Sequence, residues 1–308
     1  NRVKALLIET KSGRSAILGR AFIDCSGDGD LAAFAGAAYE KGDAGGHLLY
    51  PTMMFRVSGV DAALAGDAWR TIPALMEAAE KRGVKFPRKG AIIRPQKHSG
   101  EWRINVTQVK NRAGTAADGT DAHELSAGEI EGRRQAMAFF GFLRREAPGF
   151  ADSYVVDIPP QLGIRETRRI TGQYQLTADD VLSCASFADT IGVNGWPIEN
   201  HVAGDVIWRW PDIPASRGFN HLPYRMLVPQ TLDKKAFDNL LVAGRCASMT
   251  HEGQSAARVS GGCFVMGQAA GTAAHLSLAD NAANSDIVVT RLQEMLENDG
   301  AYLGRDIT

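Results

Sequence analysis

The sequence has few cysteines, and their spacing forms no recognisable framework. Its 308 residues include four, Cys25, Cys184, Cys246 and Cys263, with no C-x-x-C pair among them. This spacing indicates neither a zinc ribbon nor a thioredoxin-type redox pair. We expect free thiols, buried or partly buried, in a reducing compartment, which favours a cytoplasmic protein.

An excess of one charge and a long apolar run are both missing. The 34 Lys and Arg are balanced by 35 Asp and Glu, for a formal net charge of -1, whereas nucleic-acid binders are usually strongly basic. The longest apolar stretch, around residues 261–274, contains Gln268 and is shorter than a membrane span. We therefore expect a globular chain of about two domains that binds no nucleic acid and does not span a membrane.

Two common hydrolase motifs are also missing. The chain contains no Gly-x-Ser-x-Gly elbow and no His-Glu-x-x-His helix, which excludes the simplest serine hydrolases and metalloproteases. Asp28 and Asp30 offer too few oxygen ligands for a calcium loop, so we expect no metal site. A turn in which one of them caps a helix that starts at Leu31 is the simpler interpretation.

The most informative segment that is present runs from residue 239 to 280. The apolar run 240–243 is typical of a strand covered on both faces, and it ends at Gly244. A helix is predicted to begin near Ser260-Gly261-Gly262 and to carry small residues on one face. Free backbone N–H groups at such a start favour an anion or an electron-rich ring edge.

Four stretches of the chain together resemble the FAD-dependent oxidoreductase family (FAD_oxidored), which has a glutathione-reductase-like fold. The resemblance implies an α/β protein with FAD as cofactor, in which a hydride passes from a small-molecule substrate to flavin N5 and then to an unidentified electron acceptor. A homo-oligomer is compatible with it. The four stretches follow the family's order: residues 22–42 (FIDCSGDGDLAAFAGAAYEKG), 101–109 (EWRINVTQV), 163–181 (GIRETRRITGQYQLTADDV) and 239–280.

The resemblance also implies how the chain is divided. We expect an incomplete FAD-binding domain at 1–50 and 236–308 and an inserted α+β substrate domain at 51–235. The G-x-G-x-x-G turn that holds a dinucleotide is not found, and Asp28 in the nearest sequence, Gly27-Asp28-Gly29, would repel a diphosphate. We therefore expect a C-terminal part of a longer enzyme whose first βαβ unit lies upstream.

The resemblance places the cofactor against two loops and one helix start. The loop after the strand near residues 21–23 and the loop after Val242 would contact the cofactor, with Arg245 either near a phosphate oxygen or on the surface. The dipole of the helix that starts at Ser260 would favour the reduced flavin at its N1–C2 edge. The implied cofactor-binding residues are Gly27, Asp28, Gly29, Gly244, Arg245, Ser260, Gly261 and Gly262.

The catalytic candidates are His251, Glu252 and Arg165. We expect His251 to take the substrate proton as hydride leaves, because it lies in the loop that runs along the flavin in the resembling family. Arg165 and Arg169 are predicted to share one face of a strand, either as a clamp for a substrate carboxylate or hydroxyl or as part of an ion-pair network. His201 and His221 are further candidates for the substrate side.

Two other functions remain open from the sequence. One is a non-catalytic or incomplete flavoprotein fragment that does not hold FAD by itself. The other, weaker, is a hydrolase that uses carboxylates such as Asp28, Asp30 or Glu252.

The sequence also predicts several elements. A hairpin that feeds a longer strand is expected at the start of the chain. Residues 62–81 read as one helix, and Ser126 with Glu129 reads as a capping box that opens a helix ending at Pro148. A strand is expected over 165–176, followed by a short helix capped by Thr177.

Overall fold

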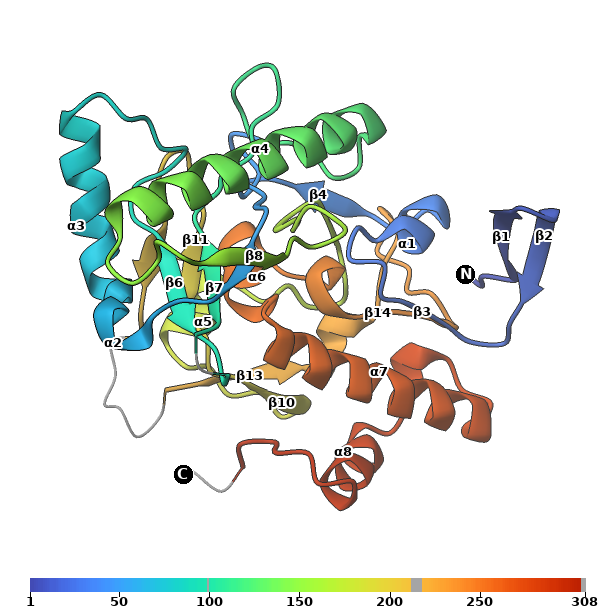
Figure 1. Cartoon of the computed structure of the whole chain (residues 1–308). Helices are drawn as coiled ribbons and strands as arrows, with labels where there is room; N and C mark the ends of the chain where they lie inside the picture. Colours follow the sequence, from blue (N-terminus) through green and yellow to red (C-terminus); the bar gives the residue numbers. More distant parts are fainter. Residues whose placement is uncertain (99, 212–217, 306–308) are drawn as a thin grey trace. The chain divides into compact units, whose positions relative to one another are not determined.

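The computed structural model describes residues 1–98, 100–211 and 218–305, which form a mixed α/β structure (Figure 1). The chain divides into two compact units. One comprises residues 1–46, 166–200 and 208–308, and the other comprises 47–165 and 201–207. Residues 166–200 and 208–235, which we expected in the substrate domain, thus cluster with the first unit. The division into FAD-binding and substrate domains is a functional one and stays a prediction.

The first unit is built from short strand pairs and from helices in its C-terminal part. Its strands are β1 (Ala5–Thr10), β2 (Gly13–Leu18), β3 (Phe22–Asp24), β4 (Tyr39–Lys41), β9 (Arg168–Ile170), β10 (Thr190–Asn194), β11 (Ile198–Asn200), β13 (Asn220–Pro223) and β14 (Leu240–Val242). Its helices are α1 (Asp30–Phe34), α5 (Ala178–Leu182), η2 (Tyr224–Leu227), η3 (Gly244–Cys246), α6 (His251–Ala257), α7 (Ser260–Asp280), η4 (Asn284–Asp286) and α8 (Val289–Asn298). β12 (Ile207–Arg209) starts at the last residue of the second unit.

The centre of the first unit is the parallel pair β3–β14. The two strands carry their labels side by side in Figure 1. Leu240 pairs with Phe22 and Val242 with Asp24, and all three residues of β14 are buried. Alanines of α7, among them Ala269 and Ala273, are fully buried in the same core, because small side chains let the helix approach its neighbours closely.

The second unit combines an antiparallel sheet with helices that pack on its core. The sheet has the order β6-β7-β5-β8, formed by β5 (Phe55–Ser58), β6 (Ile92–Pro95), β7 (Trp102–Asn105) and β8 (Tyr154–Asp157). Its helices are α2 (Ala62–Ala65), α3 (Ala68–Lys81) and α4 (Ala122–Glu146). Ile72 of α3, Phe139 of α4 and Ile104 of β7 belong to one buried apolar cluster, so sheet and helices share a core of their own.

Some predicted elements are confirmed. The opening hairpin is β1–β2, paired antiparallel from Ala5 opposite Leu18 to Thr10 opposite Gly13. Thr177 caps α5, and its hydroxyl and the Asp180 carboxylate complete a capping box. The four cysteines are free thiols as expected, with Cys184 and Cys246 buried, although Cys25 is exposed. In the described part of the chain, no helix is both long and apolar enough to cross a bilayer.

Other predicted elements were wrong. The helix expected over 62–81 is interrupted at Gly66, whose φ of +47° ends α2. The helix assigned to the Ser126 capping box begins earlier, because Asp121 accepts hydrogen bonds from the backbone N–H groups of His123 and Glu124. The strand expected over 165–176 is reduced to the three residues of β9.

Candidate functional site

The carboxyl ends of β3 and β14 bring two loops side by side in the first unit. The amide of Ala243 donates to the carbonyl of Asp24 at 3.0 Å, so the strands stay paired up to the point where both loops begin. The second loop turns at Gly244, whose φ of +83° favours glycine. Carboxyl ends of parallel strands are the usual ligand-binding edge of an α/β sheet.

The buried carboxylate of Asp24 fixes the first loop. One of its oxygens accepts from the backbone amide and the hydroxyl of Ser26, at 3.0 and 2.7 Å, and the other accepts from the amide of Ala32 at 2.9 Å. The predicted cap by Asp28 or Asp30 was wrong: the N-cap residue of α1 is Gly29, which has no side chain, and Asp30 is the first residue of the helix. Asp24 takes over part of that role from within β3.

Asp28 and Arg245, both predicted to contact the cofactor, form an ion pair with each other. The Arg245 guanidinium lies 3.0 Å from Asp28, and the Thr167 hydroxyl bridges them, donating to Asp28 at 2.6 Å and accepting from Arg245 at 3.2 Å. The guanidinium also covers Gly27, where a Cβ atom would come within 2.8 Å of it. The carboxylate that we expected to repel a diphosphate is thus neutralised.

Asp30 is neutralised in the same way by Arg168, at 2.7 Å. Glu252 is paired with Arg209, also at 2.7 Å. Each carboxylate considered for a hydrolase therefore has a cationic partner, which does not favour that function.

The start of α7 is open. Its N-cap residue, Val259, provides no side-chain cap, and Ser260 and Gly261 are exposed. A Cβ atom built on Gly261 would have no neighbour within 4 Å among the described atoms. The uncapped N–H groups and the positive dipole end of a long helix are therefore accessible to a negatively charged or electron-rich group. Gly262, in contrast, is buried, and a Cβ atom there would lie 2.3 Å from the carbonyl oxygen of Ala257, so the open part of this helix start is at Ser260 and Gly261.

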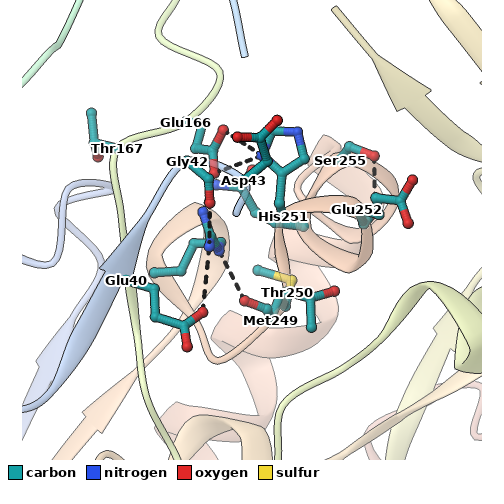
Figure 2. Close-up of polar contacts among 12 residues, drawn as sticks. Glu40, Gly42, Asp43, Glu166, Thr167, Met249, Thr250, His251, Glu252 and Ser255 are labelled. Carbon is teal, nitrogen blue, oxygen red and sulfur yellow. Dashed lines mark hydrogen bonds and ion pairs between the residues drawn. The ribbon is translucent and has the colours of Figure 1, made fainter. Parts of the chain in front are cut away.

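A buried charge cluster holds His251, which was predicted to lie in a loop but is the first residue of helix α6. The Glu166 side chain is 0% exposed, and its two carboxylate oxygens lie 3.1 and 2.9 Å from His251 Nδ1. Figure 2 shows these two side chains pointing toward each other. Because Nδ1–H donates to the carboxylate, the neutral ring carries its lone pair on Nε2, which makes no hydrogen bond to any residue described.

Arg169 completes this cluster. It forms an ion pair with Glu166, donates to the carbonyls of Met249 at 3.0 Å and Gly42 at 2.9 Å, and lies 3.4 Å from Glu40. The guanidinium therefore ties the turn before α6 to the segment after β4, and it compensates the buried charge of Glu166. The sequence grouped Glu166 with Arg165, Arg168 and Arg169 as an ion-pair network or a substrate clamp, but it placed Glu166 and Arg169 on opposite faces of a strand, whereas the two side chains form an ion pair.

His251 and Glu252, two of the three predicted catalytic residues, are neighbours on α6 but have different partners. Glu252, next to His251 on α6, points away from Glu166 toward another side (Figure 2), where Arg209 pairs with it. Arg165 belongs to the second unit, where it donates to the carbonyl of Tyr50 at 2.6 Å and to the Asn105 side chain at 3.3 Å. The catalytic roles of Glu252 and Arg165 stay predictions.

Arg258 ended the loop that the sequence favoured as a ligand site, but it was given no role of its own. It is the C-cap residue of α6 and lies two positions before α7 begins. Its Nε atom is buried without a hydrogen-bond partner. Burial lowers its pKa to about 10, against the opposing effect of the Glu199 and Glu166 carboxylates. No local sequence pattern marks an arginine as unpaired, so the unbonded Nε of Arg258 could not be predicted and is seen only in the folded chain.

Comparison with known proteins agrees with the resemblance drawn from the four stretches. The model of the family described as FAD dependent oxidoreductase matches residues 1–296. Searches of curated proteins and of solved structures gave no match. The family implies FAD binding, and the open α7 start is compatible with it. The chain belongs to the FAD-dependent oxidoreductase family.

Proposed function

We propose that this protein is a dehydrogenase that removes a hydride and a proton from a small-molecule substrate. The observation that carries the proposal is the imidazole of His251, held by the buried Glu166 carboxylate in the same unit as the open α7 start. When bound, the flavin supplies the hydride acceptor at N5. The hydride electrons leave the substrate carbon, and the proton leaves a neighbouring atom of the substrate.

The residues proposed to hold the cofactor act mainly through their backbones. The amides of Ser260, Gly261 and Gly262 would donate to the N1–C2 edge, where reduction increases negative charge. Gly29 and Gly244, both with positive φ, would line the loops beside it. Asp28 and Arg245 belong to this set, and their ion pair joins the two loops.

His251 is proposed as the base. Glu166 fixes the ring through Nδ1, so Nε2 accepts the proton, and the carboxylate stabilises the imidazolium that results. Loss of a positioned base typically lowers a rate by about 10²–10⁴-fold. We keep residues 51–235 as the proposed substrate domain, with Arg165 as its candidate substrate contact.

The first experiment measures cofactor content. The purified protein is expected to carry FAD or to bind it on addition, detected by its visible absorbance and by quenching of its fluorescence. Protein that is folded by circular dichroism but does not bind added FAD would contradict the proposal and favour the incomplete-fragment alternative.

The second experiment tests His251. In His251→Gln, flavin reduction by substrate is expected to slow by about 10²–10⁴-fold while FAD remains bound. His275→Gln is the matched control, because His275 is exposed on α7. Equal reduction rates in His251→Gln and in the control would exclude His251 as the base.

A further inference from the structure

Arg258 lies at the junction of the two helices that carry the proposed site. Its amide donates to the carbonyl of Gln254 at 3.0 Å, and its carbonyl accepts from the Cys263 thiol at 3.2 Å. The backbone of Arg258 is thus tied both to α6 and to the first turn of α7. The side chain therefore starts from a backbone that two helices hold in place, rather than from a free loop.

The charge of this side chain is not compensated by direct contacts. Among residues 1–98, 100–211 and 218–305, no hydrogen bond or ion pair of the Arg258 guanidinium is found, and its Nε atom is shielded from solvent. Arg169 and Arg245 in the same unit both have carboxylate partners. Arg258 is only partly buried, and its two Nη atoms are not among the buried unbonded atoms, so an anionic ligand could reach them and supply the missing counter-charge.

The nearest carboxylates are engaged elsewhere. Glu166 is bonded to His251 and Arg169, and Glu199 accepts from the Trp196 indole at 2.9 Å. They attract Arg258 from a distance without occupying its N–H groups. The guanidinium therefore stays protonated at neutral pH and retains donors for an incoming anion.

Arg258 and His251 lie on the same face of α6. They are seven residues apart, and the right-handed helical conformation of Arg258 (φ −75°, ψ −2°) continues the helix. Seven residues correspond to about two helical turns and a rise of about 10.5 Å. A base at one end and a cation at the other can therefore address two ends of one small molecule.

We propose that Arg258 binds the carboxylate of an anionic substrate whose reacting carbon lies toward His251. The inference rests on the proposed dehydrogenase function and narrows its substrate class to carboxylic acids. A guanidinium suits this role because its planar fork can donate two parallel hydrogen bonds to one carboxylate. Neutral substrates of the same shape would leave the cation unpaired and would bind more weakly.

The test uses ligand binding rather than turnover. Thermal unfolding of the FAD-loaded protein is recorded with succinate, malonate, lactate or mandelate, and in parallel with the corresponding amides at equal ionic strength. At least one carboxylate is expected to raise the melting temperature in a concentration-dependent way, while its amide does not. If no carboxylate in this panel stabilises the protein more than its amide, the proposal is overturned.

Variants then assign the effect to Arg258. Arg258→Gln is expected to weaken binding of the active carboxylate by at least tenfold, and Arg258→Lys to restore part of it, because an ammonium keeps the charge but lacks the fork. Arg291→Gln on the exposed face of α8 is the matched control. Wild-type affinity in Arg258→Gln overturns the assignment.

The outcomes separate this inference from the proposed function. Flavin reduction by a neutral substrate, with no selective carboxylate binding, would leave the dehydrogenase function standing and remove Arg258 as the anion site. Carboxylate binding that depends on Arg258, without flavin reduction by any bound acid, would support the anion site and count against the dehydrogenase.

Discussion

Replacing Arg258 by Met should make the unliganded protein more stable. Burial lowers the pKa of Arg258 from its ordinary value of 12.5 to about 10. At about 1.4 kcal/mol for each pKa unit, this difference corresponds to about 3 kcal/mol of destabilisation by the charged form. Methionine keeps most of the apolar stem and removes the charge, so the free energy of unfolding is expected to rise by up to about 3 kcal/mol.

The sign and the pH window follow from the direction of the shift. The folded protein binds this proton less tightly than the unfolded chain, so the destabilisation is fully present below about pH 10 and is relieved as pH rises toward 12.5. Between pH 6 and pH 9, roughly the range of ordinary buffers, the difference between the variant and the wild type should therefore be constant.

Urea unfolding of FAD-free protein, followed by circular dichroism, measures the effect. Arg225→Met is the matched control: Arg225 is half exposed and paired with Asp189 at 2.9 Å, so its loss should lower stability by about 0–1 kcal/mol. If Arg258→Met loses at least as much stability relative to the wild type as Arg225→Met does, the conclusion that the charge of Arg258 destabilises the unliganded protein is refuted.

Three further predictions concern single positions. Gly262→Ala should lose about 1–3 kcal/mol of stability, because its Cβ atom would lie 2.3 Å from a backbone oxygen, whereas Gly261→Ala, with open space, should be neutral or gain up to about 1 kcal/mol; melting temperatures of the pair decide this. Burial raises the pKa of the Cys246 thiol to about 12, whereas Cys25 is exposed. Iodoacetamide at about pH 8 should therefore modify Cys25 in the folded protein and reach Cys246 after unfolding. Mass spectrometry that finds Cys246 modified first would contradict this. Thr177→Ala should lower stability by about 1 kcal/mol through loss of the α5 cap, and an unchanged unfolding midpoint would contradict the capping geometry.

Local patterns predicted those parts of the fold that local interactions determine. The β1–β2 hairpin and the Thr177 cap depend on neighbouring residues, and the apolar run 240–243 marks β14 locally, although its partner strand β3 is distant in the chain; all three are found. The α4 start was misplaced because two side chains competed for it: Asp121 accepts from two amides, whereas the Ser126 hydroxyl donates to a carbonyl inside the helix.

The site was less accessible from sequence, because its charges are arranged by contacts between distant segments. Asp28 pairs with Arg245, and Glu166 with His251, and in neither pair are the two residues near each other in the chain. The sequence singled out most of these residues but did not predict which carboxylate pairs with which cationic or imidazole side chain. Arg258 was missed because an unpaired charge is defined by what surrounds it in space.

The pairing of β3 with β14 has a consequence for how the chain is made. Phe22 leaves the ribosome long before its partner Leu240, at synthesis rates of about 5–20 residues per second roughly ten seconds or more earlier. Most of the second unit, residues 47–165, is contiguous and is completed during that interval. During this interval the nascent β3 has no parallel partner strand and its pairing edge is exposed. We therefore expect a chaperone to have its largest effect on the yield of native protein in the time between the synthesis of β3 and that of β14.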